Sequence, residues 1–314
     1  MRRRLQQRTK RKHFALLVNR AAAGYQQKAV ERFVAEARKQ GGSYTVYEPT
    51  SALSLLKQAE VAVGLRRANA ECPAPFERGG PVTALVACGG DGTFNLVARV
   101  ALKAGVPVGL LPMGRLNNIY RSVYGQTDIN SAVKKIIGGG IRRIDSATAA
   151  NLPFFGSAGI GLGPRLMEAL EGRSVPRLAL GWSQLAARAA AEVVAEDTVL
   201  KVDAFRFDFR PIILNINLLS YSAGLPLSPA SVFDDGRVEV IFNQAGDAGN
   251  LSGYVRLIHK GKYLYGEAVR LYRGEDISIQ PVRHRTLLLD GEMIEIPSET
   301  LDVHVGAEKL QVLC

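Results

Sequence analysis

The amino-acid sequence predicts a protein of two domains, an α/β domain over residues 13–143 and a mostly β domain over residues 144–306. Three observations lead to this prediction. A chain of 314 residues is long for one small core. Continuous apolar runs alternate with helix-like segments in the first half, and short strand-like segments separated by turns follow. The composition, 47% hydrophobic and 22% charged, excludes a disordered chain, a collagen or a coiled coil.

The first half has the pattern of a parallel sheet. Helix-like spacing of apolar residues predicts helices at 26–39, 51–69 and 94–104. Strands alternating with helices favour a sheet that is covered on both faces, with ligands bound where strands end. The strands predicted from apolar runs are Phe14–Val18, Tyr44–Tyr47, Val82–Cys88 and Val106–Leu111.

The second half has the pattern of antiparallel strands. Phe205, Phe207 and Phe209 alternate with charged residues, as in a half-buried strand. One helix is predicted at 177–195, and its scattered polar residues indicate that it faces a core rather than a membrane. The cleft between the two domains is the default place for a site. The other predicted strands are Ile212–Leu219, Arg237–Phe242, Ile277–Val282, Thr286–Leu289 and Leu301–Val305.

The formal net charge of +11 is concentrated at the N-terminus, because residues 1–12 contain seven Lys or Arg and no acid. Such an arm either binds a polyanion, for which we expect the anionic surface of a membrane rather than nucleic acid, or is a solvated terminus. The chain has no apolar run long enough to span a membrane and no signal-peptide pattern. Its three cysteines have no disulfide-like or metal-ligand spacing. We therefore expect a cytoplasmic protein with a peripheral contact at the inner face of the membrane.

The strongest motif is Cys88–Thr93, which reads Cys-Gly-Gly-Asp-Gly-Thr between a predicted strand and a predicted helix. Its glycines allow the backbone to turn sharply and to approach a ligand closely. Thr93 is a suitable N-cap for a helix whose free N–H groups attract anions. Asp91 among these glycines suits Mg²⁺ coordination or a hydroxyl proton. The alternative is a plain tight turn, and the combined features favour a functional loop.

Two further loops leave predicted strands at the same edge of the sheet. Residues 19–24 follow the first strand, and Pro112–Asn118 follows the fourth. Both place small or amide-bearing residues at the carboxyl ends of strands. Together with the glycine loop they outline a pocket for a nucleotide.

The second domain carries two Asp-Gly sequences. Asp290 and Glu292 flank Gly291, and Asp235 precedes Gly236. Asp-Gly is a favoured pair for tight β-hairpin turns, so each sequence alone has a structural explanation as a hairpin. The residues by themselves leave the choice between a turn and a site open.

The motifs together resemble those of the diacylglycerol kinase catalytic-domain family, which includes sphingosine kinases and bacterial diacylglycerol and YegS-type lipid kinases. The resemblance covers about residues 14–312 and implies an N-terminal α/β nucleotide-binding domain, a C-terminal β-sandwich-like domain and a cleft between them. It also implies that 307–314 return to the first domain. The motifs that occur in the family's order are Asn19 with Gly24, Gly89–Thr93, Pro112–Asn118, Ile144-Asp145, Gly159–Gly163, Pro229–Val240 and Leu289–Glu292.

This resemblance implies an ATP- and Mg²⁺-dependent kinase that phosphorylates a primary hydroxyl of a lipid such as diacylglycerol or a related glycerolipid or sphingolipid. It makes Asp290 the candidate general base, Asp91 a Mg²⁺ ligand or a helper of the hydroxyl, and Glu292 a catalytic acid on metal or nucleotide. Asp91 and Asp290 could exchange roles. Asp235 corresponds to an acid beside a structural Mg²⁺ in bacterial members. The implied nucleotide-binding residues are Asn19, Thr50, Gly89, Gly90, Gly92, Thr93, Gly114, Arg115 and Asn117.

The Pro112–Asn118 loop departs from the family pattern, since Arg115 replaces a Thr and Asn118 replaces an Asp. We expect Arg115 to grip phosphate and so to replace part of the charge that a metal carries; otherwise it points to solvent. Two alternatives to a lipid kinase remain: an NAD kinase, which shares the glycine loop, and a non-catalytic lipid- or nucleotide-binding relative. The sequence lacks the P-loop motif of other kinases.

Overall fold

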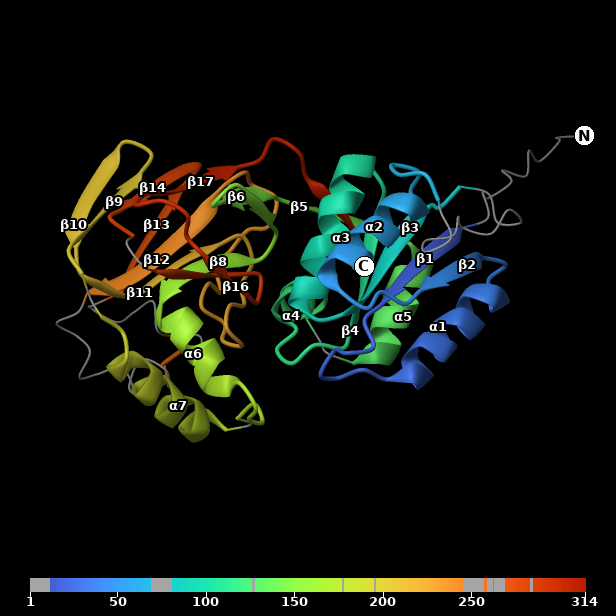
Figure 1. Ribbon diagram of the computed structural model, residues 1–314, viewed down its shortest axis with the longest axis horizontal. Coiled ribbons are helices and arrows are strands. Elements are labelled where there is room, and N and C mark those ends of the chain that lie inside the picture. The colour runs from blue at the N-terminus through green and yellow to red at the C-terminus, as the bar shows by residue number, and fades with distance from the viewer. Residues whose placement is uncertain are drawn as a thin grey trace, which may run out of the picture.

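The computed structural model describes residues 12–68, 81–125, 128–176, 178–194, 196–244, 257–258, 262, 269–282 and 285–314. They form two lobes side by side, with the C-terminus in the same lobe as the first strands (Figure 1). Almost all of the basic arm, residues 1–11, lies outside the described residues. The expectation about its membrane contact therefore stays a prediction.

The first lobe is built on a six-stranded sheet in the order β2-β1-β3-β4-β18-β5. Its strands are parallel except for β5, which runs antiparallel to β18. Every residue of β1, β3 and β4 is buried, which is why these segments are continuous apolar runs. The strands are β1 (His13–Val18), β2 (Ser43–Tyr47), β3 (Ala84–Gly89), β4 (Val108–Pro112), β5 (Ile141–Ile144) and β18 (Leu310–Leu313).

Among the described residues, five helices accompany this sheet, with α1 packed beside α5 and α2 beside α3. Helix α3 begins at Asp91, three residues before the predicted start, because Gly90 rather than Thr93 takes the extended N-cap conformation. Helices α4 and α5 were not predicted; α4 is short and has no side-chain cap, whereas α5 does have an Asp128 cap. The helices are α1 (Gln27–Lys39), α2 (Ala52–Ala62), α3 (Asp91–Ala104), α4 (Asn118–Tyr124) and α5 (Ile129–Gly138).

The second lobe contains two further six-stranded sheets, in the orders β10-β9-β14-β17-β6-β7 and β13-β12-β11-β8-β15-β16. The sheets pack on each other through aromatic rings: the ring centroid of Phe242 lies 6.0 Å from that of Phe207 and 4.6 Å from that of Phe209. The strands are β6 (Ala147–Ala149), β7 (Leu152–Phe154), β8 (Ser157–Gly161), β9 (Thr198–Val202), β10 (Phe205–Phe209), β11 (Pro211–Asn217), β12 (Val238–Gln244), β13 (Val269–Gly274), β14 (Asp276–Gln280), β15 (Thr286–Leu289), β16 (Glu292–Glu295) and β17 (Leu301–Val305).

Two helices, α6 (Leu162–Leu170) and α7 (Ala179–Ala191), pack against each other at one corner of this lobe (Figure 1). Helix α7 is shorter than the predicted 177–195, and its buried Trp182 joins a second apolar cluster with Leu166. Leu116 from the first lobe belongs to the same cluster, so the cluster bridges the lobes. Within the described ranges, no helix has the length and apolarity required to cross a membrane.

The chain passes between the lobes through two short connectors. Asp145–Ser146 joins β5 to β6, and residues 306–309 join β17 to β18. The connectors are hydrogen-bonded to each other, since the Gly306 N–H donates to the Ser146 carbonyl at 2.7 Å and the Ser146 hydroxyl donates to the Glu308 carbonyl at 2.8 Å. The last strand of the chain thus fills the place between β4 and β5 in the first sheet.

Candidate active site

The glycine loop between β3 and α3 lies directly against the loop that follows β4. A Cβ atom on Gly114 would lie 2.3 Å from the Cα of Gly90, so both positions require glycine. The Met113 N–H donates to the Gly89 carbonyl at 2.8 Å, and the Gly24 N–H donates to the Met113 carbonyl at 2.8 Å. The three loops predicted to form one pocket are therefore bonded into a single surface at the carboxyl edge of the sheet.

A cavity of about 620 Å³ opens beside this surface. Asn19 lies at its wall, where its amide donates to the Thr93 hydroxyl at 3.0 Å and its carbonyl oxygen accepts from the Ala21 N–H at 3.0 Å. Thr50 enters the wall from the loop between β2 and α2, and Glu292 enters it from the second lobe. Both lobes therefore contribute residues predicted from the sequence to one cavity.

Asp91 lies in the first turn of α3 and is buried. Its Oδ1 accepts from the Ile119 N–H at 2.8 Å, and its Oδ2 accepts from the Asn118 N–H and side-chain amide at 2.9 and 3.2 Å. The carboxylate thus binds the N-terminus of α4, where free N–H groups attract a negative charge. Burial raises the pKa of Asp91 to about 6, although these hydrogen bonds oppose the rise.

Asp290 occupies the two-residue turn between β15 and β16, where both Asp290 and Gly291 have positive φ. Its Oδ1 accepts from the N–H groups of Gly156 and Ser157 at 2.8 and 2.9 Å. Its Oδ2 accepts from the Phe155 N–H at 2.8 Å. With the donor described next, these bonds fill all four lone-pair positions of the carboxylate. The hairpin that the sequence left as an alternative is present, and its acid is a buried acceptor.

Asn95 and Arg99 are two residues of this site that the sequence analysis missed. Asn95, on α3, donates its amide to Asp290 Oδ2 at 2.8 Å and to the Pro153 carbonyl at 3.0 Å, which joins the lobes. Arg99 lies one turn further along and interacts electrostatically with Glu292 and Asp290. The spacing of Asp91, Asn95 and Arg99 puts three polar side chains on one face of a mostly apolar helix, and this pattern could have indicated them.

Glu292 differs from the two aspartates in its surroundings. It is exposed at the cavity wall, and within the described part of the chain no group donates a hydrogen bond to its carboxylate. Partial burial raises its pKa, Arg99 opposes the rise, and Asp290 adds to it. A Cβ on Gly92 would lie 2.6 Å from Glu292 Oε1, so glycine at that position leaves room for this carboxylate. Glu292 is the acid with free acceptor positions beside the glycine loop.

The residues of the Pro112–Asn118 loop are not among those that line this cavity. Asn117 closes the loop on itself, because its amide group accepts from the Gly114 N–H at 2.8 Å and donates to the Gly114 carbonyl at 3.0 Å. Gly114 and Asn117 line a separate cavity of about 560 Å³. Arg115 is exposed and donates to the Leu170 carbonyl at 3.0 Å, at the end of α6. The geometry therefore favours a contact between lobes for Arg115 over the expected phosphate contact.

Asp235 does not line the 620 Å³ cavity. It lies in the segment that leads into β12, which pairs with β11 across a long connection rather than across a two-residue turn, so the hairpin explanation does not hold there. Its Oδ2 accepts from Arg273 at 2.8 Å, and its Oδ1 accepts from the Arg237 N–H at 3.2 Å. Arginine, rather than open space, therefore faces this carboxylate.

Comparison with known proteins agrees with this architecture. A family model described as the diacylglycerol kinase catalytic domain matches residues 13–149, and one described as the YegS C-terminal NAD kinase beta sandwich-like domain matches residues 156–314. A diacylglycerol kinase of Staphylococcus saprophyticus is 26% identical over 272 residues, which cover 79% of this chain and 87% of that protein. A diacylglycerol kinase of Staphylococcus haemolyticus is 26% identical over the same share of this chain and 81% of its own length.

Solved structures share the fold. A diacylglycerol kinase from Bacillus anthracis superposes with a TM-score of 0.68 at 13% identity and covers 96% of each chain. A candidate diacylglycerol kinase from the same species gives a TM-score of 0.74 at 17% identity and covers 97% of each chain. The matches confirm the predicted family resemblance, the two-domain fold and the enzyme class, a phosphotransferase. This chain belongs to the diacylglycerol kinase family.

Proposed function

We propose that this protein transfers the γ-phosphate of ATP, with Mg²⁺, to a primary hydroxyl of a lipid such as diacylglycerol or a related glycerolipid or sphingolipid. The observation that carries the proposal is the 620 Å³ cavity, whose wall combines Asn19, Thr50 and Thr93 of the first lobe with Glu292 of the second. A nucleotide bound along the glycine loop would meet an acceptor held by the second lobe. Phosphoryl transfer needs this positioning and charge neutralisation more than covalent chemistry.

The first lobe would bind the nucleotide. A Cβ at Gly89, Gly90 or Gly92 would meet Thr93, Gly114 or Glu292 at 2.4, 3.0 or 2.6 Å, so glycine allows this tight loop to form beside the cavity. The N–H groups at the start of the following helix would attract phosphate oxygens. Asn19 and Thr93, which are hydrogen-bonded to each other, and Thr50, which lines the same cavity, offer neutral polar groups to the rest of the nucleotide. Gly114 and Asn117 shape the loop beneath the glycine loop rather than the cavity itself.

Two carboxylates of the site, those of Asp91 and Glu292, could bind a Mg²⁺ ion that arrives in complex with the nucleotide. The described residues include no group of three or more His, Cys, Asp or Glu side chains that could hold a metal alone. Asp91 keeps one lone-pair position on Oδ1, and Glu292 keeps its whole carboxylate, so these two could add oxygen ligands to those of the phosphates. The ion, when bound, would neutralise charge on the transferring phosphate.

Proton transfer from the lipid hydroxyl calls for an acid with a free oxygen. All four acceptor positions of Asp290 are filled, which favours a positioning role for this residue over the role of general base expected from the family resemblance. Glu292 follows it by two residues, faces the cavity and has a raised pKa, which suits a base. We therefore assign proton acceptance to Glu292, with Asp290 fixing the hairpin that presents it.

A radiolabelled ATP assay over a panel of lipids and NAD tests the proposal. We expect label in a lipid that carries a primary hydroxyl, and we expect the transfer to require Mg²⁺. Label in NAD alone would reject a lipid acceptor. Nucleotide binding without transfer to any acceptor would indicate a relative that has lost its chemistry.

The basic arm is a candidate contact with the membrane that holds the substrate. Deletion of residues 1–11 removes six of the seven N-terminal cations, so binding to anionic vesicles should weaken and lose most of its salt dependence. Transfer to a detergent-dispersed lipid should persist, because the described residues that line the cavity all lie outside the arm. Equal vesicle binding by the full-length and truncated proteins at low salt would reject the arm as an anchor.

A further inference from the structure

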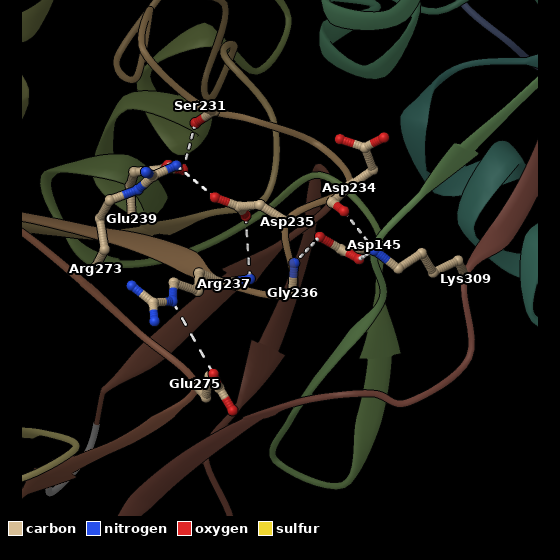
Figure 2. A network of polar contacts seen from close by, with 10 residues as sticks. All are labelled: Asp145, Ser231, Asp234, Asp235, Gly236, Arg237, Glu239, Arg273, Glu275 and Lys309. Atoms are coloured by element: carbon tan, nitrogen blue, oxygen red, sulfur yellow. Dashed lines mark hydrogen bonds and ion pairs between the residues drawn. The ribbon is translucent and has the colours of Figure 1, made fainter.

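A network of polar contacts among ten residues lies outside the cavity, beside the two connectors between the lobes (Figure 2). It combines the first connector, at Asp145, with the second connector, at Lys309, and with the segment 231–239 that leads into β12. The Asp145 N–H also donates to the Phe233 carbonyl at 2.7 Å. Both places where the chain passes between lobes are therefore tied to one segment of the second lobe.

Lys309 is the cation in the half of this network that lies at the two connectors. Its Nζ lies 3.0 Å from Asp145 Oδ1 and donates to the Asp234 carbonyl oxygen. Asp145 is 1% exposed, and its other oxygen accepts from the Gly236 N–H at 2.7 Å. A buried carboxylate and a backbone carbonyl are oxygen ligands of the kind that divalent cations use. Here they converge on an ammonium group that the chain itself supplies.

Arg273 is the cation in the other half of the network, where it also lies between oxygen acceptors. Its Nε and Nη2 donate to Glu239 Oε1 at 3.0 and 2.9 Å, and its Nη2 also donates to Asp235 Oδ2 at 2.8 Å. Glu239 is 1% exposed, and its second oxygen accepts from the Ser231 hydroxyl at 2.6 Å. One guanidinium thus neutralises a buried and a surface carboxylate at once. Figure 2 shows Arg273 and Lys309 on opposite sides of Asp235 and Gly236.

The structural Mg²⁺ implied by family resemblance at Asp235 does not fit this arrangement. Both Asp235 oxygens have nitrogen donors. Asp145 Oδ1 is paired in charge with Lys309 at 3.0 Å, although it accepts no hydrogen bond from the described residues. The Asp234 carboxylate points away from the network (Figure 2). A divalent ion here would have to displace Lys309 or Arg273, and two cations close together repel.

We infer that Lys309 and Arg273 are built-in cations that replace a metal ion. The two connectors and the segment 231–239, which together we call the hinge, are therefore held in place without any divalent cation. The inference is independent of the proposed activity, because none of these residues lines the cavity. It predicts a protein whose divalent-cation requirement belongs to catalysis alone.

The first test uses the nucleotide-free wild-type protein. Its melting temperature should differ by less than about 1 °C between excess MgCl₂ and excess EDTA at matched ionic strength, because no metal binds only the native state at the hinge. A larger Mg²⁺ stabilisation that disappears in Asp235→Asn or Asp145→Asn would overturn the inference. A Mg²⁺ stabilisation that both variants retain would place the ion elsewhere, in agreement with it.

The second test removes the ammonium. Lys309→Met leaves the buried Asp145 carboxylate without its cation, so the melting temperature should fall by about 4–8 °C. The double variant Asp145→Asn/Lys309→Met should recover at least half of that loss. The matched control is Arg237→Met, whose exposed guanidinium lies 4.0 Å from Glu275 and should matter little. Equal, small shifts in Lys309→Met and Arg237→Met would overturn the inference.

Discussion

The cleft around the 620 Å³ cavity and the hinge both contain buried carboxylates, but the hydrogen-bond donors that these carboxylates contact differ in charge. In the cleft, Asp91 and Asp290 accept hydrogen bonds from backbone N–H groups and amides, which carry no net charge. In the hinge, Asp145 and Glu239 face the full positive charges of Lys309 and Arg273. Neutral donors hold a carboxylate in place without cancelling its charge, whereas an ion pair cancels it.

This difference decides which region can attract a cation or a proton. Burial raises the pKa of Asp91, Asp290 and Glu292, and among the described residues Arg99 is the cation that interacts with Glu292 and Asp290. Burial also raises the pKa of Glu239, but there the Ser231 hydroxyl and the Arg273 guanidinium oppose the rise. Negative charge that is held but not cancelled suits a Mg²⁺–nucleotide complex and a transferred proton. The hinge has its counter-charges already and serves as structure. Each prediction below tests one side of this contrast.

The largest effect should come from Glu292→Gln. The substitution removes the acid with free oxygens in the cavity, so turnover should fall by about 10²–10⁴-fold while the melting temperature stays near that of the wild type. Steady-state kinetics on the lipid that the panel identifies would measure it. Glu295→Gln, three residues along the same strand, is the control and should keep full activity. A turnover within a few-fold of the wild type would show that Glu292 is not needed.

Asp290→Asn should primarily cost stability. In the variant, the NH₂ group of the new asparagine would face N–H donors that bind the Asp290 carboxylate in the wild type. The unfolding free energy should therefore fall by about 2–4 kcal/mol. Asn95→Ala, which removes the donor from α3, should produce a smaller loss in the same direction. Urea denaturation measures both, with exposed Asp302→Asn as the control. Unchanged stability together with lost turnover would restore Asp290 as the base.

Asp91 should make stability depend on pH. Its pKa rises from 3.8 to about 6 on folding, so the folded protein holds this proton more tightly than the unfolded chain. The stability that the proton provides is complete below pH 3.8 and is lost as the pH rises through 6. Between about pH 5 and pH 7, the unfolding free energy of the wild type should fall by about 1 kcal/mol relative to Asp91→Asn. A pH-independent difference between the two proteins would contradict the assignment.

Arg115→Thr should have the smallest effect. Its guanidinium contacts the Leu170 carbonyl and not the cavity, so the Kd for ATP should change by less than about three-fold. Isothermal titration with ATP and Mg²⁺ would measure it. A loss of ten-fold or more would place Arg115 on a phosphate, and the cleft would then contain a counter-charge of its own.

Much of the fold could be predicted from the sequence because burial controls the pattern of residues. The fully buried β1, β3 and β4 are continuous apolar runs, and the half-exposed β10 alternates. Helix α4 could not be predicted, because its N-terminus is bound by Asp91 from another element rather than by a local cap. The three-residue strands β6 and β7 depend on sheet partners that are distant in the chain.

The site could be predicted as a set of residues but not as a set of roles. The order of the motifs predicted a shared site for Asn19, Thr50, Thr93 and Glu292, and these four residues line one cavity. The number of donors around Asp290 could not be read from its motif, because those donors belong to residues 155–157 and to Asn95. Likewise, the cationic partners of Asp145 and Asp235, which are Lys309 and Arg273, lie 164 and 38 residues away along the chain.

The position of β18 also dictates the order in which the protein can be completed during synthesis. Residues 310–313 pair with both β4 and β5, and among the described strands β18 is the one that pairs with β5. The lobe that leaves the ribosome first is therefore the lobe that is finished last, after the whole second lobe has been made. A gene fragment that encodes only the first 149 residues would yield a sheet with a missing strand and an exposed apolar edge. The first lobe therefore needs the last strand of the chain to complete its sheet.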